Sequence, residues 1–429
     1  MSPAGPPRTR GGSAVLSVGA GIALSSAVGY LLLALVSRML GPSDFALFMS
    51  FWGVMFGLAS SLAMVEQEAA RQSAEGDMSG AAPIRQVVMA AALIAGAAAA
   101  LTLLPPVAAR VYGDEQSMLG WFVLVATFGF SVQFMIRGLL IGSGRVRSYS
   151  LLIVAEAMVR LLALLLVWAT VDASLGSVAG AIALGAFGWV FWAREAHRLT
   201  AASGTDDGTP TTRRPWRAPL LRAASLMAAA ALTASIITGF PTMVTVVAGG
   251  SVGHAGGAIF AALQASRVPL LFVAPLQALA VPTIVRWRQR DVTSGPSVRT
   301  LIARGVLGTL VVAIVAAGAA WFVGPWGVRL AFGQDYVVTS EAVAGLVFSA
   351  CFLALLQLMS AALVAFGSYR WVSVTWGTAA ACTVLWLLAS PLGVVGSTVV
   401  GALVGPAAGT AVALVVLWRL AHDAPAPGA

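Results

Sequence analysis

Three charged side chains interrupt apolar runs that are otherwise long enough to cross a membrane: Glu156, Arg160 and Arg267. A lone arginine in hydrocarbon costs at least ~2.5 kcal/mol on insertion scales, so Arg267 should face a wet cavity or a partner. Its planar guanidinium could bind a diphosphate with two parallel hydrogen bonds. Gln264 lies one helical turn earlier on the same face, and we place both in a candidate anion site. The alternative is a structural arginine that pairs with a carbonyl or with Glu156.

Glu156 and Arg160 are spaced as neighbours on one helical face. One interpretation is charge neutralisation within a single helix, which needs no function. The other is that Arg160 adds to the anion site while Glu156 takes up a coupling proton. The sequence leaves both interpretations open.

A second charged group closes the apolar run 41–72 and contains Glu66, Glu68 and Arg71. These residues could form a cytoplasmic gate, in which the acids pair with Arg286 of the other half of the chain when the inner side is closed. The alternative is a solvated helix end.

The composition defines the class of protein. The chain has 429 residues, of which 59% are hydrophobic and 10% charged, and its mean hydropathy is +0.91. Such a chain is typical of a polytopic membrane protein, whose spans are helices because lipid offers no partners for backbone groups. We therefore predict an all-α membrane protein.

Reading apolar stretches of ~20 residues as spans predicts about 12 transmembrane helices. The expected spans are 14–37, 41–72, 84–104, 118–141, 149–170, 175–192, 220–247, 258–285, 301–323, 342–366, 371–388 and 394–420. They form two six-helix bundles, 14–193 and 220–420, joined by a polar cytoplasmic linker, 194–219. Short tails, 1–13 and 421–429, complete the chain.

The chain has a net charge of +9, and all 25 of its basic residues are arginines, since it has no lysine. Most of them fall on the side where we place both termini, as the positive-inside rule requires of the cytoplasmic side. Arg137, Arg145, Arg147 and Arg370 belong to this set; they could instead meet anionic headgroups or an incoming diphosphate. The arginines are scattered through loops, so we expect no nucleic-acid partner. The absence of lysine favours a GC-rich genome and hence a bacterial cytoplasmic (inner) membrane.

Three pairs of marks recur in the same order and indicate two pseudo-symmetric copies of one unit. The spacing from Phe45 to Arg71 returns between Phe260 and Arg286. Tyr112-Gly113 is echoed by Phe332-Gly333, and the Gly142–Arg145 stretch by the Gly367–Arg370 stretch. Duplicated helical bundles are typical of transporters, in which substrate sits between the repeats.

Several segments, in order along nearly the whole chain, resemble the multidrug/oligosaccharidyl-lipid/polysaccharide exporter superfamily, and within it the polysaccharide (O-antigen type) flippases. The matching segments are SRMLGPSDFALF (37–48), VEQEAAR (65–71), LLIGSGRVRSYS (139–150), FAALQASRVPLLFVAPLQALAVPTIVR (260–286), FGQDY (332–336) and LVAFGSYRW (363–371). The resemblance implies two six-helix bundles around a central cavity, alternating access, and a polyprenyl-diphosphate-linked glycan as cargo.

Two other cargoes stay open. A multidrug or organic-cation antiporter of the same superfamily needs acids inside the membrane, and only Glu156 lies mid-span against two arginines. A flippase for the peptidoglycan precursor (lipid II) would carry the same diphosphate.

We expect membrane lipids and glycan polymerase or assembly proteins as further partners. The sequence lacks a G-x-x-x-x-G-K-[ST] loop, metal-ligand spacing and a polar catalytic loop. We therefore expect no cofactor, no metal and no enzyme activity.

Overall fold

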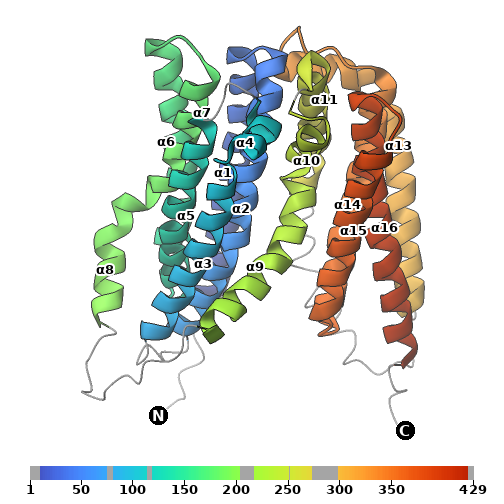
Figure 1. The fold of residues 1–429 in the computed structure, drawn as a ribbon. Coiled ribbons are helices and arrows are strands. Elements are labelled where there is room, and N and C mark those ends of the chain that lie inside the picture. Colours follow the sequence, from blue (N-terminus) through green and yellow to red (C-terminus); the bar gives the residue numbers. More distant parts are fainter. Residues whose placement is uncertain are drawn as a thin grey trace. The chain divides into compact units, whose positions relative to one another are not determined.

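The structure is a computed structural model that describes residues 10–74, 81–113, 118–202, 217–250, 252–272 and 298–423. Within these ranges the chain forms helices joined by short turns, and no strand occurs among them. Figure 1 shows these elements as helical ribbons joined by connecting segments. The predicted all-α fold is confirmed.

The first half of the chain forms nine helical elements before the 203–216 segment, which lies outside the described residues. They are α1 (Arg10–Met39), α2 (Pro42–Ala74), α3 (Ala81–Leu101), α4 (Pro105–Tyr112), α5 (Met118–Gly142), α6 (Val146–Thr170), α7 (Leu175–Ala183), η2 (Leu184–Trp192) and α8 (Ala193–Ala202). The expected span 175–192 is thus an α-helix followed by a 3₁₀ stretch, and the helix α8 extends it into the predicted linker.

The second half contains eight described helical elements. They are α9 (Arg217–Ile237), α10 (Phe240–Val247), α11 (Gly253–Ser266), η3 (Val268–Phe272), α13 (Val298–Phe332), α14 (Ser340–Ala365), α15 (Tyr369–Ala389) and α16 (Val394–Asp423). Much of the expected span 258–285 lies outside the described residues.

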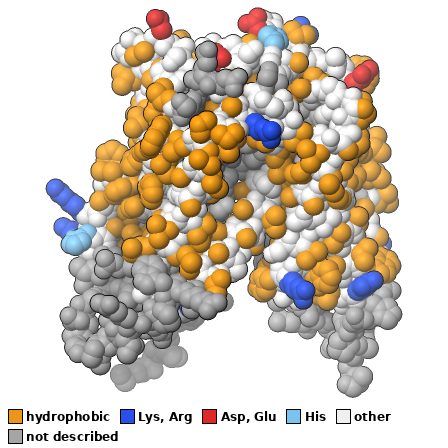
Figure 2. All heavy atoms as spheres, viewed as in Figure 1, with side chains coloured by type: hydrophobic (Ala, Val, Ile, Leu, Met, Phe, Trp, Pro, Cys, Tyr) orange, Lys and Arg blue, Asp and Glu red, His pale blue; other side chains and the backbone are white. Residues whose placement is uncertain are grey.

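Among the described residues, nine helices are long and apolar enough to cross a membrane, or up to 11 if each of two bent pairs counts as one span. The count agrees with the prediction of about 12, because the described part of the eighth expected span is too short to qualify. Hydrophobic side chains cover most of the face shown in Figure 2, and the Asp and Glu side chains visible there lie at its upper rim. The chain is a multi-pass membrane protein.

The described chain divides into two compact units that do not follow the chain order strictly. The first contains residues up to Met39 and Val54–Ala231, and the second contains Leu40–Gly53 and Leu232–Ala429. Helices α2 and α9 therefore each contribute to both units. The predicted bundles, 14–193 and 220–420, are defined by repeats along the chain, whereas these units are defined by contacts in space. The bundle boundaries therefore stay predictions.

Two spans are broken where proline or glycine interrupts the helical hydrogen bonds. The α3 helix ends before Pro105-Pro106, and α4 leaves it at 83°. The α9 helix ends at Ile237, before Gly239 and Pro241, and α10 follows at 76°.

Glycine conformations at two turns support the internal repeat. Gly113 (φ 82°) and Gly333 (φ 125°) follow the ends of α4 and α13, each donating its backbone N–H to the residue four earlier. Gly144 (φ 74°) and Gly367 (φ 73°) follow the ends of α5 and α14, each donating its backbone N–H to the residue three earlier. Positive φ favours glycine. The structure therefore pairs Gly144, and not Gly142, with Gly367, which corrects the predicted register of this echo.

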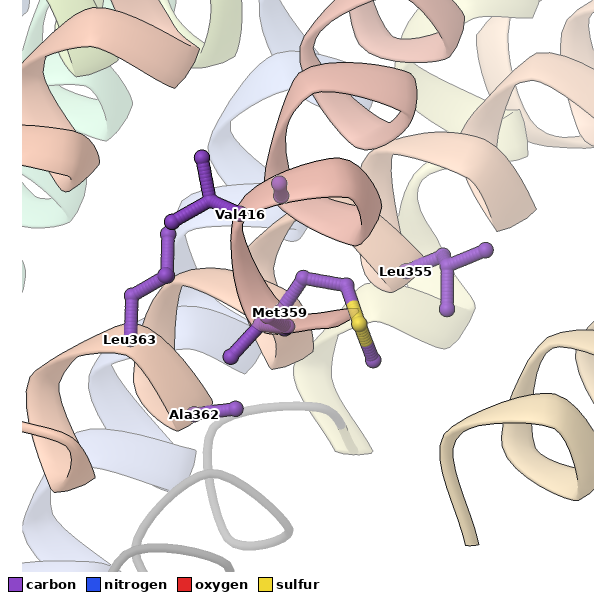
Figure 3. Close-up of a cluster of buried hydrophobic side chains, with 7 residues drawn as sticks. Leu355, Met359, Ala362, Leu363 and Val416 are labelled. Carbon is purple, nitrogen blue, oxygen red and sulfur yellow. The ribbon is translucent and has the colours of Figure 1, made fainter. Parts of the chain in front are cut away.

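The second unit has an aliphatic core between α14 and α16. Leu355, Met359, Leu363 and Val416 are buried there (Figure 3), together with Leu417. Ile302 and Val306 of α13 pack against this core. It therefore holds one end of α13 against the two other helices.

Candidate functional site

Three helices of the first unit bring six polar side chains into one group. The group, which we call the charged cluster, contains Glu66 of α2, Gln133 and Arg137 of α5, and Tyr149, Glu156 and Arg160 of α6. The side chains of its four charged residues are between 7% and 16% exposed. Ionised groups withdrawn this far from water need partners, and each has one in the cluster.

Glu156 lies at the centre of the cluster. Arg160 donates an Nη2 hydrogen bond to its Oε1, and Gln133 donates from Nε2 to its Oε2. Arg137 Nη1 lies 3.8 Å from the same Oε2. The predicted Glu156–Arg160 pair therefore forms, but a second helix also supplies an arginine and an amide to this carboxylate.

Glu66 forms the other end of the cluster. The Tyr149 hydroxyl donates to its Oε1 at 2.7 Å, and Arg137 Nε lies 3.1 Å from its Oε2. The side chain is only 15% exposed, so the solvated helix end considered for Glu66 does not form. Arg137 lies between the two carboxylates and links them into one chain of charges.

Close helix packing positions these groups. At Gly138 of α5, a Cβ atom would lie 2.4 Å from the backbone oxygen of Glu66, so only glycine lets α2 approach this far. At Gly185 of η2, a Cβ atom would lie 2.4 Å from Cγ and Nε of Arg160. A Cβ atom at Gly188 would lie 3.2 Å from Cα of Glu156, which is also a tight contact. The glycines therefore let α2 and η2 close around the charges.

Aromatic rings cover the two guanidinium groups. Cζ of Arg137 lies 4.9 Å from the centre of the Phe134 ring, and Cζ of Arg160 lies 4.9 Å from that of Phe56. The Phe130 ring lies 5.7 Å from Arg160 Cζ. Cation–π contacts of this kind stabilise the charge and fix the plane of each guanidinium.

The cluster combines two carboxylates with two guanidinium groups, so its formal charge is zero. Gln133 Oε1 and Arg160 Nε are nonetheless buried without a hydrogen-bond partner. Buried polar atoms are normally satisfied, so these two atoms are exceptions within the cluster.

Arg267 and Gln264 belong to the second unit. Arg267 is the C-terminal cap of α11 and not a mid-helix residue, because Pro269 disfavours helical geometry just before it. Its Nη1 donates to the carbonyl of Ile237, and its Nη2 donates to that of Ile236 at 3.2 Å. The structure thus shows the carbonyl pairing considered above. Gln264 Nε2 lies 4.0 Å from Sδ of Met49, and anion binding at these residues stays a prediction.

The predicted gate residues are only partly described. Glu68 pairs with Arg71 at 2.8 Å and accepts a hydrogen bond from Gln72. Glu66 turns instead to Arg137 and Tyr149. Arg286 lies outside the described residues, so the gate stays a prediction.

Sequence reasoning missed Gln133, Arg137 and Tyr149. It placed Arg137 with the cytoplasmic arginines, which stays a prediction, but it did not foresee that this side chain, 16% exposed, lies against Glu66 and Glu156. A signal was available: Gln133 and Arg137 have the same four-residue spacing as Glu156 and Arg160, which places each pair on one helical face.

Solved structures with the same architecture are transporters. The chain matches the inward-facing conformation of a multidrug resistance MATE family transporter of the MOP superfamily, with a TM-score of 0.67 and 14% identity over 94% of this chain and 96% of that one. It also matches a MOP superfamily transporter from Pyrococcus furiosus, with a TM-score of 0.53 and 16% identity over 95% and 96%. The chain therefore has the two-lobed fold of the MATE transporters, as the superfamily resemblance predicted. That these structures are transporters is consistent with the expectation of no enzyme activity.

Curated relatives define the family more narrowly. The uncharacterized protein Rv3630 of Mycobacterium tuberculosis is 30% identical over 440 residues, covering 97% of this chain and 96% of that protein. The uncharacterized protein Rv1510 of the same organism is 30% identical over 430 residues, covering 94% and 91%. This chain belongs to the same family as these mycobacterial proteins. No protein-family model matches the sequence.

Proposed function

We propose that this protein is a flippase that moves a polyprenyl-diphosphate-linked oligosaccharide across the cytoplasmic membrane by alternating access. The MATE fold supports a membrane exporter, and the sequence resemblance supports the cargo. The proposal includes a bacterial inner membrane, cytoplasmic termini, and contact with membrane lipids and glycan-assembly proteins.

The observation that carries the proposal is the pairing of acids inside the described spans. Glu66 lies against Arg137, Glu68 against Arg71 and Glu156 against Arg160. An exporter of organic cations needs carboxylates that are available to the cation. Here each of these acids is already held by a guanidinium, whereas an anionic cargo can compete for the arginines.

This competition supplies a mechanism. Protonation of Glu156 would remove the charge that holds Arg160 and attracts Arg137, and both guanidinium groups could then bind a diphosphate. Release of the anion would return both guanidinium groups to the Glu156 carboxylate. Proton uptake and anion binding are thus coupled through one carboxylate.

Arg267 and Gln264 are the second proposed anion site. Two backbone carbonyls accept hydrogen bonds from the Arg267 guanidinium. A diphosphate would replace these carbonyls with a stronger, charge-assisted partner. The positive charge near the break between α9 and α10 is the feature that this part of the proposal uses.

The test is transport in proteoliposomes that contain the full-length protein and a labelled polyprenyl-diphosphate oligosaccharide. We expect Glu156→Gln to remove the pH dependence of flipping and Arg267→Ala to abolish flipping. Arg329→Ala is the matched control, because it changes an exposed arginine in the last turn of α13. Normal flipping by a folded, inserted Arg267→Ala variant would refute the anion role of Arg267. Flipping by Glu156→Gln that keeps its pH dependence would refute the proton role.

A multidrug or organic-cation antiporter is the second candidate, because the solved neighbour with a TM-score of 0.67 is a multidrug resistance transporter. The Pyrococcus furiosus structure is described as having a reverse polarity of its binding pocket that suggests a different function, so this fold accommodates both polarities. A fluorescent cation assayed in the same vesicles separates the two candidates. Lipid II used in place of the oligosaccharide tests the peptidoglycan precursor.

A further inference from the structure

One end of the second unit carries a groove between α13 and α16. It consists of an open hollow of ≈ 330 Å³ between the two helices and an adjoining open hollow of ≈ 310 Å³ on α16, and the two share Trp418. We call it the α13–α16 groove. Its lining residues are Thr300, Ala303, Arg304, Leu307, Leu414, Val415, Trp418 and Arg419. Hollows of ~300–1,000 Å³ are the size at which proteins bind small molecules.

The core of the second unit fixes this groove in place. Ile302 and Val306 of α13 and Leu420 of α16 pack onto the buried cluster that includes Val416 and Leu363 (Figure 3). The opposite faces of the same two helical ends remain outside the core. The groove is therefore formed by rigid helix rather than by a loop.

The groove is basic at its outer end. Arg304 lies in the second turn of α13, and Arg419 lies one turn before the end of α16. Both side chains are exposed, and no acidic residue is among those that line the two hollows. Two guanidinium groups beside one tryptophan therefore offer an anion two charged partners.

The groove becomes apolar toward the middle of each span. Leu307 follows Arg304 along α13 and is 62% exposed, and Val415 precedes Arg419 along α16 and is 54% exposed. Trp418, at 48% exposed, lies at the boundary between the two zones. Tryptophan prefers the headgroup level of a bilayer, and long arginine side chains reach toward it.

This arrangement complements a phospholipid, because the cations lie at headgroup level and the aliphatic side chains lie at acyl-chain level. We propose that the α13–α16 groove binds the headgroup phosphate of an anionic phospholipid through Arg304 and Arg419, while the acyl chains lie along Leu307 and Val415. The site is separate from the transport chemistry proposed above and does not depend on the identity of the cargo.

The test is native mass spectrometry of the full-length protein released from detergent with added phosphatidylglycerol or phosphatidylcholine. The intact protein should retain phosphatidylglycerol preferentially. Loss of both cations in Arg304→Ala/Arg419→Ala should weaken phosphatidylglycerol binding about 30-fold, from the usual contribution of a basic residue at an anionic surface. The Arg304→Lys/Arg419→Lys variant keeps the charges and should keep most of the preference.

Arg329→Ala is the matched control, because Arg329 is an exposed arginine at the other end of α13. An equal loss of phosphatidylglycerol in this control would overturn the proposal, since it would indicate a general effect of charge. Equal retention of the two lipids by the intact protein would also overturn it. Displacement of the lipid by inorganic phosphate alone would assign the groove to a free anion instead of a lipid headgroup.

Discussion

The two compact units solve the problem of charge in a membrane differently. In the first unit, two carboxylates and two guanidinium groups contact one another between the helices. In the described part of the second unit, the buried charged residue is Arg267, which is 8% exposed and donates hydrogen bonds to backbone carbonyls. The core around α14 and α16 is aliphatic.

This difference shows that the two copies of the repeat kept their backbone turns while their interiors diverged. The glycines that end α5 and α14 have nearly identical φ angles. By contrast, nothing in the described second unit corresponds to the Glu66–Arg137–Glu156 chain of ion pairs. Backbone turns define the fold, whereas buried charge is retained at a cost in stability and more often serves function.

The strongest test of this contrast is Arg160→Met, which leaves Glu156 buried beside fewer cations. Breaking one partner of a buried ion pair costs about 3–5 kcal/mol, and we expect a correspondingly large loss of thermal stability in detergent. The double variant Glu156→Leu/Arg160→Met removes both charges and should recover much of that loss. A single variant as stable as the intact protein would show that the cluster is not a buried ion-pair network.

Two tyrosine hydroxyls, one from each unit, sharpen the comparison because their acceptors differ in charge. Tyr149 donates to the Glu66 carboxylate at 2.7 Å, and Tyr336 donates to the Leu40 carbonyl at 3.2 Å. A hydrogen bond to a charged group contributes about 1.5–3 kcal/mol, against about 0.5–1.5 kcal/mol for a neutral one. Tyr149→Phe should therefore lower the unfolding temperature more than Tyr336→Phe does, and the reverse order would contradict the charge contrast.

Glycine substitutions compare the packing of the two units. A Cβ at Gly185 would lie 2.4 Å from Arg160, whereas nothing lies within 4 Å of a Cβ at Gly318 of α13. Gly185→Ala should cost about 1–3 kcal/mol through overpacking. Gly318→Ala should be neutral or stabilising by up to about 1 kcal/mol, since alanine favours helix. Equal unfolding temperatures for the two variants would mean that Arg160 moves freely.

The smallest expected effect concerns pH in the turn between α13 and α14. Burial, with smaller contributions from Asp335 and Asp44, raises the pKa of Tyr336 above its ordinary value of 10.0. A raised folded pKa means that the stability from the neutral phenol is fully present below pH 10.0 and is lost as the pH rises further. Above pH 10.0, the free energy of unfolding should fall more steeply with rising pH for the intact protein than for Tyr336→Phe. Identical slopes would exclude this role for the phenol.

Much of the fold could be predicted because hydrophobic runs, prolines and glycines act locally. The long apolar stretches became helices, and two of them break at Pro105 and at the Gly239–Pro241 segment, where local sequence disfavours a continuous helix. The register of the second glycine echo was misassigned, since both Gly142 and Gly144 could have matched Gly367. Only the backbone angle separates them.

The site could be predicted only where partners share a helix. The Glu156–Arg160 pair follows from its four-residue spacing. The contacts of Arg137 depend on α2, whose Glu66 approaches because Gly138 has no side chain. Arg267 similarly finds its acceptors at the end of another helix, α9. Contacts between helices are not encoded in any local pattern, so sequence spacing alone could not supply them.

The balance of charge in the first unit has an electrical consequence. Moving one elementary charge across a potential of 100 mV changes its free energy by about 2.3 kcal/mol. A group with equal numbers of acids and bases can travel with its helices at almost no such energy. If the proposed transport takes place, its voltage dependence then reports only the charges that enter or leave with it.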